Sequence, residues 1–139
     1  MHDPEKSDPS GVASKPANAP AVAGGVLEAL RIAAAEPERR ARLWHNVEVM
    51  RAALRERGVD IGDSTSQVIP IMVNDDHRVF AVTEQLMAAG IYLNPVRYPA
   101  VKRHRSRLRV SVSSIHEPEQ LVHAAERIAD VLRRLEVIA

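Results

Sequence analysis

The sequence predicts an α/β domain of the α+β type: a small antiparallel three-stranded sheet with helices on one face, preceded by a long helical segment. Apolar residues recur at helical spacing in several stretches and alternate strictly in one. Glycines and prolines separate these stretches. After two leading helices the order is β-α-β-β-α, which is typical of a sheet with helices packed on one side.

The two leading helices form the long helical segment. The first is expected from about Ala21 to Glu36, because a residue before proline resists helix geometry. The second is expected from Pro37, a residue suited to a first helical turn, to Arg57, with Gly58 ending it. Its core side is predicted to hold Leu43, Trp44, Val47, Met50 and Leu54.

The remaining elements are shorter. Residues 68–73 indicate a buried strand, in which Pro70 favours an edge position. Residues 74–76 offer caps for a third helix that ends at Gly90. The other strands are predicted at 91–96 and 107–113, and the last helix from about Pro118, with Glu117 as its cap.

The strand at 107–113 is the most informative element. A right-handed crossover between the first two strands leaves a gap that this strand fills, so it is expected at the centre. It alternates strictly, with Arg109 on the side opposite the apolar residues. The planar guanidinium of Arg109 suits a carboxylate held at two points. The alternative is a solvated polar face, and spacing alone does not decide between the two.

Composition excludes several classes of function. The chain has 19 Lys and Arg against 18 Asp and Glu, a net charge of +1, which gives no broad attraction to nucleic acid or acidic membranes. No apolar run could span a bilayer, and no signal-peptide core is visible. There is no cysteine, so disulfides and thiolate zinc sites are excluded and a cytoplasmic location is the default expectation. An RNA-binding sheet would expose aromatic residues, but the only phenylalanine, Phe80, falls in a predicted helix.

Residues 1–19 differ from the rest of the chain. Pro4, Pro9 and Pro16 stand among polar residues without an apolar period, which predicts a disordered leader. Residues 20–139 are then expected to form a single small domain.

Five stretches, at 20–25, 43–46, 62–70, 90–99 and 107–116, resemble in order and spacing the C-terminal domain of the α-oxoamine synthases. These are pyridoxal-phosphate (PLP) enzymes of fold type I. The resemblance implies a fold of the kind predicted above. It also implies an acyltransferase activity that condenses an amino acid with an acyl thioester.

The resemblance gives roles to particular residues. Arg109 matches the family arginine that binds the carboxylate of the amino acid. Thr65 and Ser66 match a segment near the substrate entrance, although a strand-entry turn explains them equally well. His116 also matches the family and is interpreted as structural rather than catalytic.

The loop that holds Tyr98, Pro99, Lys102 and Arg103 matches a family loop beside the thioester channel. Tyr98 and Lys102 replace prolines of the family pattern, which leaves the rigidity of the loop in doubt and adds a cation. This cluster could meet the phosphates of coenzyme A or of a carrier-protein pantetheine arm. A solvated loop is the competing interpretation.

PLP chemistry needs a lysine that the chain does not supply in a suitable context. Lys6 and Lys15 fall in the leader, and Lys102 falls in the loop. In the family this lysine lies upstream, in a large domain. The chain is therefore expected to be a fragment that is not catalytically competent alone, and its leader, unlike the family, favours a shortened reading frame.

The expected partners are the missing large PLP-binding domain or its chain, a further copy of this chain in a dimer, and the amino-acid and thioester substrates. No metal, nucleic acid or membrane is expected. The alternative function is a non-enzymatic small-ligand or protein-interaction module that retains Arg109.

Overall fold

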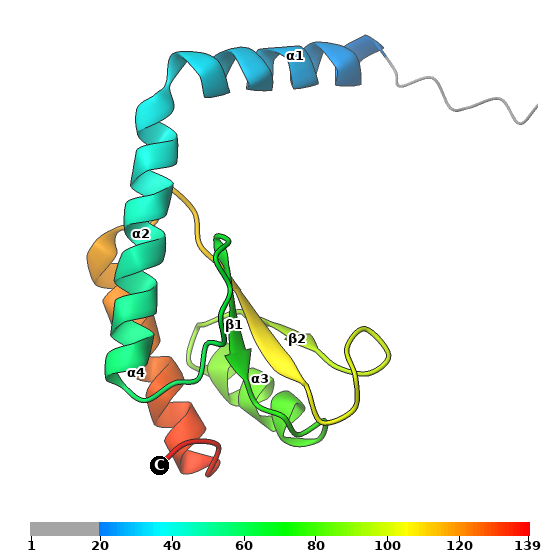
Figure 1. Ribbon diagram of the computed structural model, residues 1–139, viewed down its shortest axis with the longest axis vertical. Helices are drawn as coiled ribbons and strands as arrows, with labels where there is room; N and C mark the ends of the chain where they lie inside the picture. The colour runs from blue at the N-terminus through cyan, green and yellow to red at the C-terminus, as the bar shows by residue number, and fades with distance from the viewer. Residues whose placement is uncertain (1–19) are drawn as a thin grey trace, which may run out of the picture. The chain divides into compact units, whose positions relative to one another are not determined.

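The computed structural model describes residues 20–139 (Figure 1). The described chain divides into two units, helix α1 (Pro20–Ala35) and the residues from Glu36 to Ala139. The predicted disordered leader lies outside the described residues. Helix α1 has no buried residue and carries these exposed apolar side chains: Val22, Val26, Leu27 and Leu30.

Helix α1 is the first predicted helix, and the second unit contains the other predicted elements in the predicted order. They are α2 (Pro37–Glu56), β1 (Val68–Met72), α3 (Arg78–Ala88), β2 (Asn94–Val96), β3 (Arg107–Ser111) and α4 (Pro118–Arg134). The predicted strand at 91–96 was too long, because β2 begins only at Asn94. The strand predicted at 107–113 is also shorter, since β3 ends at Ser111. The chain beyond Ser111 turns to reach α4.

The sheet has the order β1-β3-β2, with β3 central and antiparallel to both neighbours (Figure 1). The predicted antiparallel three-stranded sheet is therefore confirmed. Pro70 lies in β1, an edge strand as expected, and stands opposite Arg109 of β3. On the other side of Arg109 stands Asn94 of β2.

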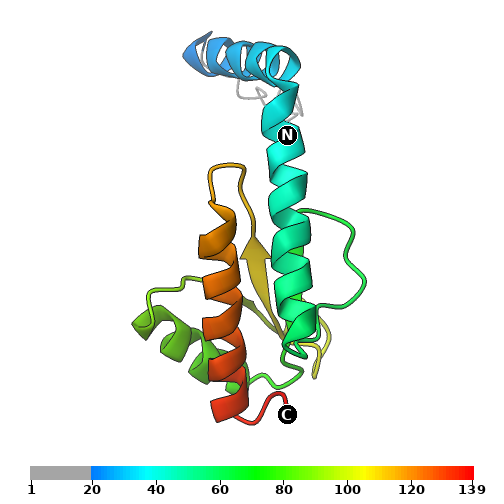
Figure 2. The ribbon, with the colours of Figure 1, turned by 90° about the vertical axis from the view of Figure 1, so that its left-hand side faces the viewer.

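One face of the sheet is covered by helices, and the core lies between them. Helices α2 and α4 pack side by side (Figure 2), and α4 also contacts α3. The paired strand residues on the covered face, Ile69 with Val110 and Ile71 with Leu108, are all buried. The buried helical residues include Val47, Met50, Leu54, Val79, Val82, Leu86, Leu121, Ala125, Ile128 and Leu132.

The prediction that Trp44 belongs to this core is wrong. Trp44 is 41% exposed, whereas Met50, predicted with it, is 1% exposed. The reason is position along the helix rather than the side chain itself. From Pro37 to His45 no residue of α2 is buried, and the buried positions begin at Asn46. The first turns of α2 therefore carry Trp44 beyond the core.

The helix ends show why the predicted boundaries fit. Glu117 and Gln120 form a reciprocal capping box at the start of α4, which confirms Glu117 as its cap. Before α3, Asp75 Oδ1 accepts hydrogen bonds from the backbone N–H groups of His77 (2.8 Å) and Arg78 (2.9 Å). These two bonds stabilise the charged carboxylate and lower the pKa of Asp75. After α3, Gly90 has a φ of +80°, a conformation that glycine adopts at little cost.

None of the helices described within residues 20–139 is long and apolar enough to cross a bilayer.

Candidate functional site

Arg109 is the central charged residue of the open face of the sheet. It lies in the middle of β3 between Pro70 and Asn94, and its side chain is exposed. Within residues 20–139 its guanidinium has no hydrogen-bond or ion-pair partner. A rigid strand thus presents an unpaired guanidinium, with its donors available to a ligand.

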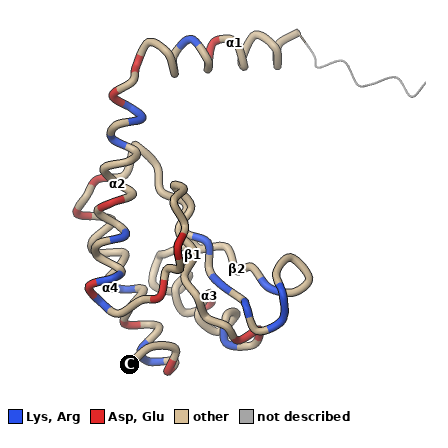
Figure 3. The backbone as a smooth tube through the Cα atoms, viewed as in Figure 1, with Lys and Arg blue, Asp and Glu red and all other residues tan. Residues whose placement is uncertain are grey.

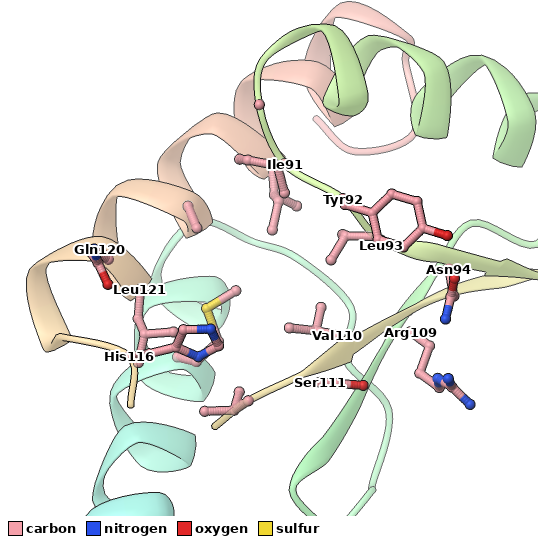
Figure 4. A pocket seen from close by; sticks show the side chains of 15 residues that line it. Ile91, Tyr92, Leu93, Asn94, Arg109, Val110, Ser111, His116, Gln120 and Leu121 are labelled. Carbon is pink, nitrogen blue, oxygen red and sulfur yellow. The ribbon is translucent and has the colours of Figure 1, made fainter. Parts of the chain in front are cut away.

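A cavity of about 470 Å³ lies beside Arg109 (Figure 4). It opens where β3 continues past the end of β2, so that Val110 and Ser111 have a strand neighbour on the β1 side only. Figure 4 shows Tyr92, Asn94 and Arg109 at one end of the cavity and His116 with Leu121 at the other. The cavity therefore connects the open face of the sheet with the layer of helices.

The turn between β3 and α4 is fixed by side chains. Asn46, which is 1% exposed, donates from Nδ2 to the carbonyl oxygens of Ser113 (3.0 Å) and His116 (2.7 Å). His116 Nδ1 in turn accepts a hydrogen bond from the backbone N–H of Ser113 (3.1 Å). These contacts give His116 a structural task, and a neutral imidazole bonded in this way carries its proton on Nε2.

The segment with Thr65 and Ser66 forms the entry to β1. The Ser66 hydroxyl donates to Val68 O (3.1 Å) and accepts from Val68 N–H (3.2 Å), so its bonds serve the turn. Thr65 is exposed and makes no side-chain hydrogen bond in the described part of the chain. Thr65 and Ser66 lie before β1 and do not line the cavity beside Arg109.

Arg51 holds this entry segment in place, which the sequence analysis missed. Only 8% exposed, it donates from Nη2 to the carbonyl oxygens of Ser64 (2.5 Å) and Ser66 (2.9 Å). Its Nη1 donates to Glu48 (3.0 Å). The available signal was its spacing, because Arg51 follows the core residue Val47 by one helical turn and so falls on the buried side of α2.

The loop between β2 and β3 gathers positive charge (Figure 3). The Arg103 guanidinium lies over the Tyr98 ring, 4.6 Å from its centroid. Lys102 and Arg103 are exposed and have no ion-pair partner among residues 20–139. Tyr98, Pro99 and Lys102 help to line a shallow hollow there. This hollow lies at the start of β3, and the cavity beside Arg109 at its far end.

The described residues do not form a site for PLP. Lys102 is the only lysine among them, and it lies on an exposed loop rather than at the end of a buried strand. The open guanidinium of Arg109 suits the carboxylate of a substrate. A residue that could form a covalent bond with the cofactor is not supplied by residues 20–139.

Comparison with known proteins gives the class. The chain is 34% identical to a serine palmitoyltransferase of Sphingobacterium spiritivorum over 118 residues, which covers 85% of this chain and 30% of that protein. It is also 34% identical to an 8-amino-7-oxononanoate synthase of Symbiobacterium thermophilum, covering 86% of this chain and 30% of the relative. The chain thus spans about a third of the length of these relatives.

Solved structures agree. The serine palmitoyltransferase of S. paucimobilis with a bound PLP–myriocin aldimine matches with a TM-score of 0.72 and 27% identity, over 78% of this chain and 28% of that one. The Sphingomonas wittichii serine palmitoyltransferase matches with a TM-score of 0.68 and 30% identity, over 73% of this chain and 26% of that one. The fold is therefore that of a region of the fold-type-I PLP enzymes, as the resemblance implied.

The family model for aminotransferase class I and II matches residues 7–128. The chain belongs to this family, and the similarity to α-oxoamine synthases expected from its sequence is confirmed. The relatives named above are PLP-dependent.

Proposed function

We propose that this chain is the substrate-binding part of a PLP-dependent acyltransferase that condenses an amino acid with an acyl thioester. The observation that carries the proposal is the exposed guanidinium of Arg109 at the centre of the sheet, which has no partner among residues 20–139. The similarity to serine palmitoyltransferases and 8-amino-7-oxononanoate synthases supports it.

The proposed task of Arg109 is to bind and orient the amino acid. Its fork of N–H donors can hold both oxygens of a carboxylate, which fixes the direction of the bonds around the α-carbon. The strand supports this geometry because β3 is paired on both sides at Arg109. Bound PLP would supply the electron sink for the reaction at that carbon.

The proposed task of the loop with Tyr98, Pro99, Lys102 and Arg103 is to meet the phosphates of the thioester carrier. Two exposed cations and a concave surface support this role. Thr65 and Ser66 are proposed to border the substrate entrance, with Ser66 acting through the turn that it closes.

The activity is proposed to need a further polypeptide region that holds the cofactor. The chain spans about 30% of its relatives, and its described residues do not form a PLP site. Helix α1 exposes Val22, Val26, Leu27 and Leu30, which supports a covering partner or self-association.

Co-expression with the remaining region of a serine palmitoyltransferase relative tests the proposal. The expected complex shows the visible absorbance of protein-bound PLP, and that absorbance changes when an amino acid is added. Arg109→Gln should weaken the amino-acid response at least tenfold without removing the cofactor. Arg107→Gln, on the same face of the same strand, is the matched control and should respond like the parent chain. A folded complex without bound PLP, or an Arg109→Gln complex with an unchanged response, would contradict the proposal.

The second candidate is a small-ligand module that works without a cofactor-bearing partner. It is favoured by the fact that the Arg109 side chain is already exposed to solvent in the chain alone. Titration of the isolated chain with glycine, alanine and serine separates the two. Binding at Arg109 that is as tight alone as in the complex favours the module, and binding that appears only in the complex favours the enzyme part.

A further inference from the structure

The cavity beside Arg109 exists because β2 is shorter than β3 and begins only at Asn94. β2 pairs with β3 only as far as Asn94, which stands opposite Arg109. Residues 91–93 leave the sheet at this point. Beyond Arg109, the free side of β3 therefore borders the cavity, and α4 closes its inner end.

The two ends of this cavity differ in chemistry. Arg109, Asn94 and the strongly exposed Tyr92 stand at the mouth (Figure 4). The inner walls are almost entirely apolar and consist of Met50, Ile91, Leu93, Val110, Val112, Leu121, Ala124 and Ile128. An apolar chamber with a single cation at its mouth is matched by a ligand with one negative end and an apolar tail.

We propose that this cavity binds an aliphatic carboxylate, with its carboxylate at Arg109 and its hydrocarbon chain inside the chamber. The inference rests on the carboxylate-binding role of Arg109 under the proposed function and adds a site for the rest of the molecule. The volume of about 470 Å³ lies within the range of about 300–1,000 Å³ that is usual for small-molecule sites.

The orientation follows from desolvation. A carboxylate loses much free energy when it leaves water without full compensation, whereas a methylene chain gains when it does so. The Arg109 guanidinium points away from His116 and Leu121 (Figure 4), so a carboxylate bound to it stays outside the apolar part. The polar side chains at the inner end are His116 and Gln120 (Figure 4). His116 Nδ1 already accepts a hydrogen bond from Ser113 N–H, and Gln120 Oε1 already accepts one from Glu117 N–H.

Two sources present this chemistry. One is an α-amino acid with an aliphatic side chain, and the other is a simple fatty acid. The first would extend the proposed function, because the amino-acid substrate would be larger than glycine or serine. The second would make the cavity a site for a free acid. Only the α-ammonium group distinguishes the two ligands.

Titration of the full chain, followed by the backbone amide resonances of Val110, Ala124 and Ile128, tests the inference. The ligands are acetate, butyrate, hexanoate and octanoate in one series, and glycine, alanine, norvaline and norleucine in the other. Affinity should rise about fourfold for each added methylene, which corresponds to ~0.8 kcal/mol per buried CH₂, until the chamber is full. Norleucine binding more tightly than hexanoate, which has the same number of carbons, identifies the amino acid; the reverse identifies the fatty acid.

Variants that fill the chamber with a larger side chain at Ala124 test whether the hydrocarbon chain binds there. Ala124→Leu should remove the dependence on chain length while acetate and glycine still bind, and the smaller Ala124→Val should stop the rise at a shorter chain. Ala52→Leu, at an exposed position of α2 away from the cavity, is the matched control. A folded Ala124→Val chain that responds as the parent does to every ligand would overturn the inference.

The outcome also separates this inference from the proposed function. Arg109-dependent binding that is equal for all chain lengths overturns the aliphatic site and leaves the carboxylate role of Arg109 intact. Binding that rises with chain length but is unchanged in Arg109→Gln overturns both the proposed orientation and the role of Arg109.

Discussion

The two faces of the sheet are built from alternate residues of the same strands, yet they have opposite properties. On the covered face, Ile69, Ile71 and Leu108 are fully buried. On the open face, Arg109 and Ser111 are exposed and have no side-chain partner among residues 20–139. The contrast shows that the covered face contributes to the core of the fold, whereas the open face remains accessible. Changes on the two faces should therefore affect different measurements.

The largest expected effect comes from Leu108→Ala. Truncation of this fully buried side chain leaves a cavity and should lower the free energy of unfolding by about 2–5 kcal/mol. The adjacent change Arg109→Ala, on the open face, should alter it by no more than ~0.5 kcal/mol. Urea unfolding of the two variants measures the contrast. Equal losses would show that the faces do not divide stability and binding in this way.

The next effect concerns the turn after β3. Asn46→Ala removes the two hydrogen bonds to Ser113 O and His116 O and should cost about 1–3 kcal/mol of unfolding free energy. The chemical shift of the His116 ring should also change. Asn94→Ala on the open face is the control, and a loss as large as that of Asn46→Ala would contradict the prediction.

A smaller effect is expected from pH at the start of α3. Because the pKa of Asp75 is lowered in the folded chain, its carboxylate adds stability above its ordinary pKa, and this contribution disappears as the pH falls through the lowered value. Asp75→Asn should remove this part of the acid destabilisation. Unfolding at neutral and strongly acidic pH measures it. Asp63→Asn, at an exposed aspartate whose side chain forms no hydrogen bond within residues 20–139, is the control for the loss of one carboxylate.

The smallest effect on stability is expected at the basic loop. Lys102→Ala should change the free energy of unfolding by no more than ~0.5 kcal/mol, because the side chain is exposed and unpaired within the described chain. The same change should weaken the binding of coenzyme A, measured by titration calorimetry. Arg40→Ala, at an exposed position of α2, provides the control. Identical coenzyme A binding by all three chains would remove the support for a phosphate role of this loop.

Much of the second unit was predictable because its patterns are strong. Strict alternation located β3 and set Arg109 apart from Leu108, and crossover handedness placed β3 at the centre. The apolar stripe and the Glu117 cap located α4. The alternation, the apolar stripe and the cap are signals carried by residues that lie close together along the chain.

The features that sequence analysis missed depend on contacts between distant segments. The exposure of Trp44 follows from where α2 passes beyond its neighbours, which its periodicity does not encode. Arg51 is buried because carbonyl groups of a later turn accept its hydrogen bonds. The cavity beside Arg109 depends on the late start of β2 at Asn94, and the first and last residues of a strand are weakly marked in a sequence. The roles of Arg109, Thr65, Ser66 and the basic loop stay predictions.

Pro70 has a consequence for how other chains can join the sheet. The backbone groups of β1 that point away from β3 are those of Val68, Pro70 and Met72. The N–H of Val68 donates to Ser66 Oγ (3.2 Å), and the N–H of Met72 donates to Asp60 O (2.9 Å). Proline has no N–H to donate. The outer border of β1 thus offers no free donor to a fourth strand, so the sheet is protected from edge-to-edge growth there. On the β1 side, a second polypeptide therefore has to contact side chains rather than add a strand to the sheet.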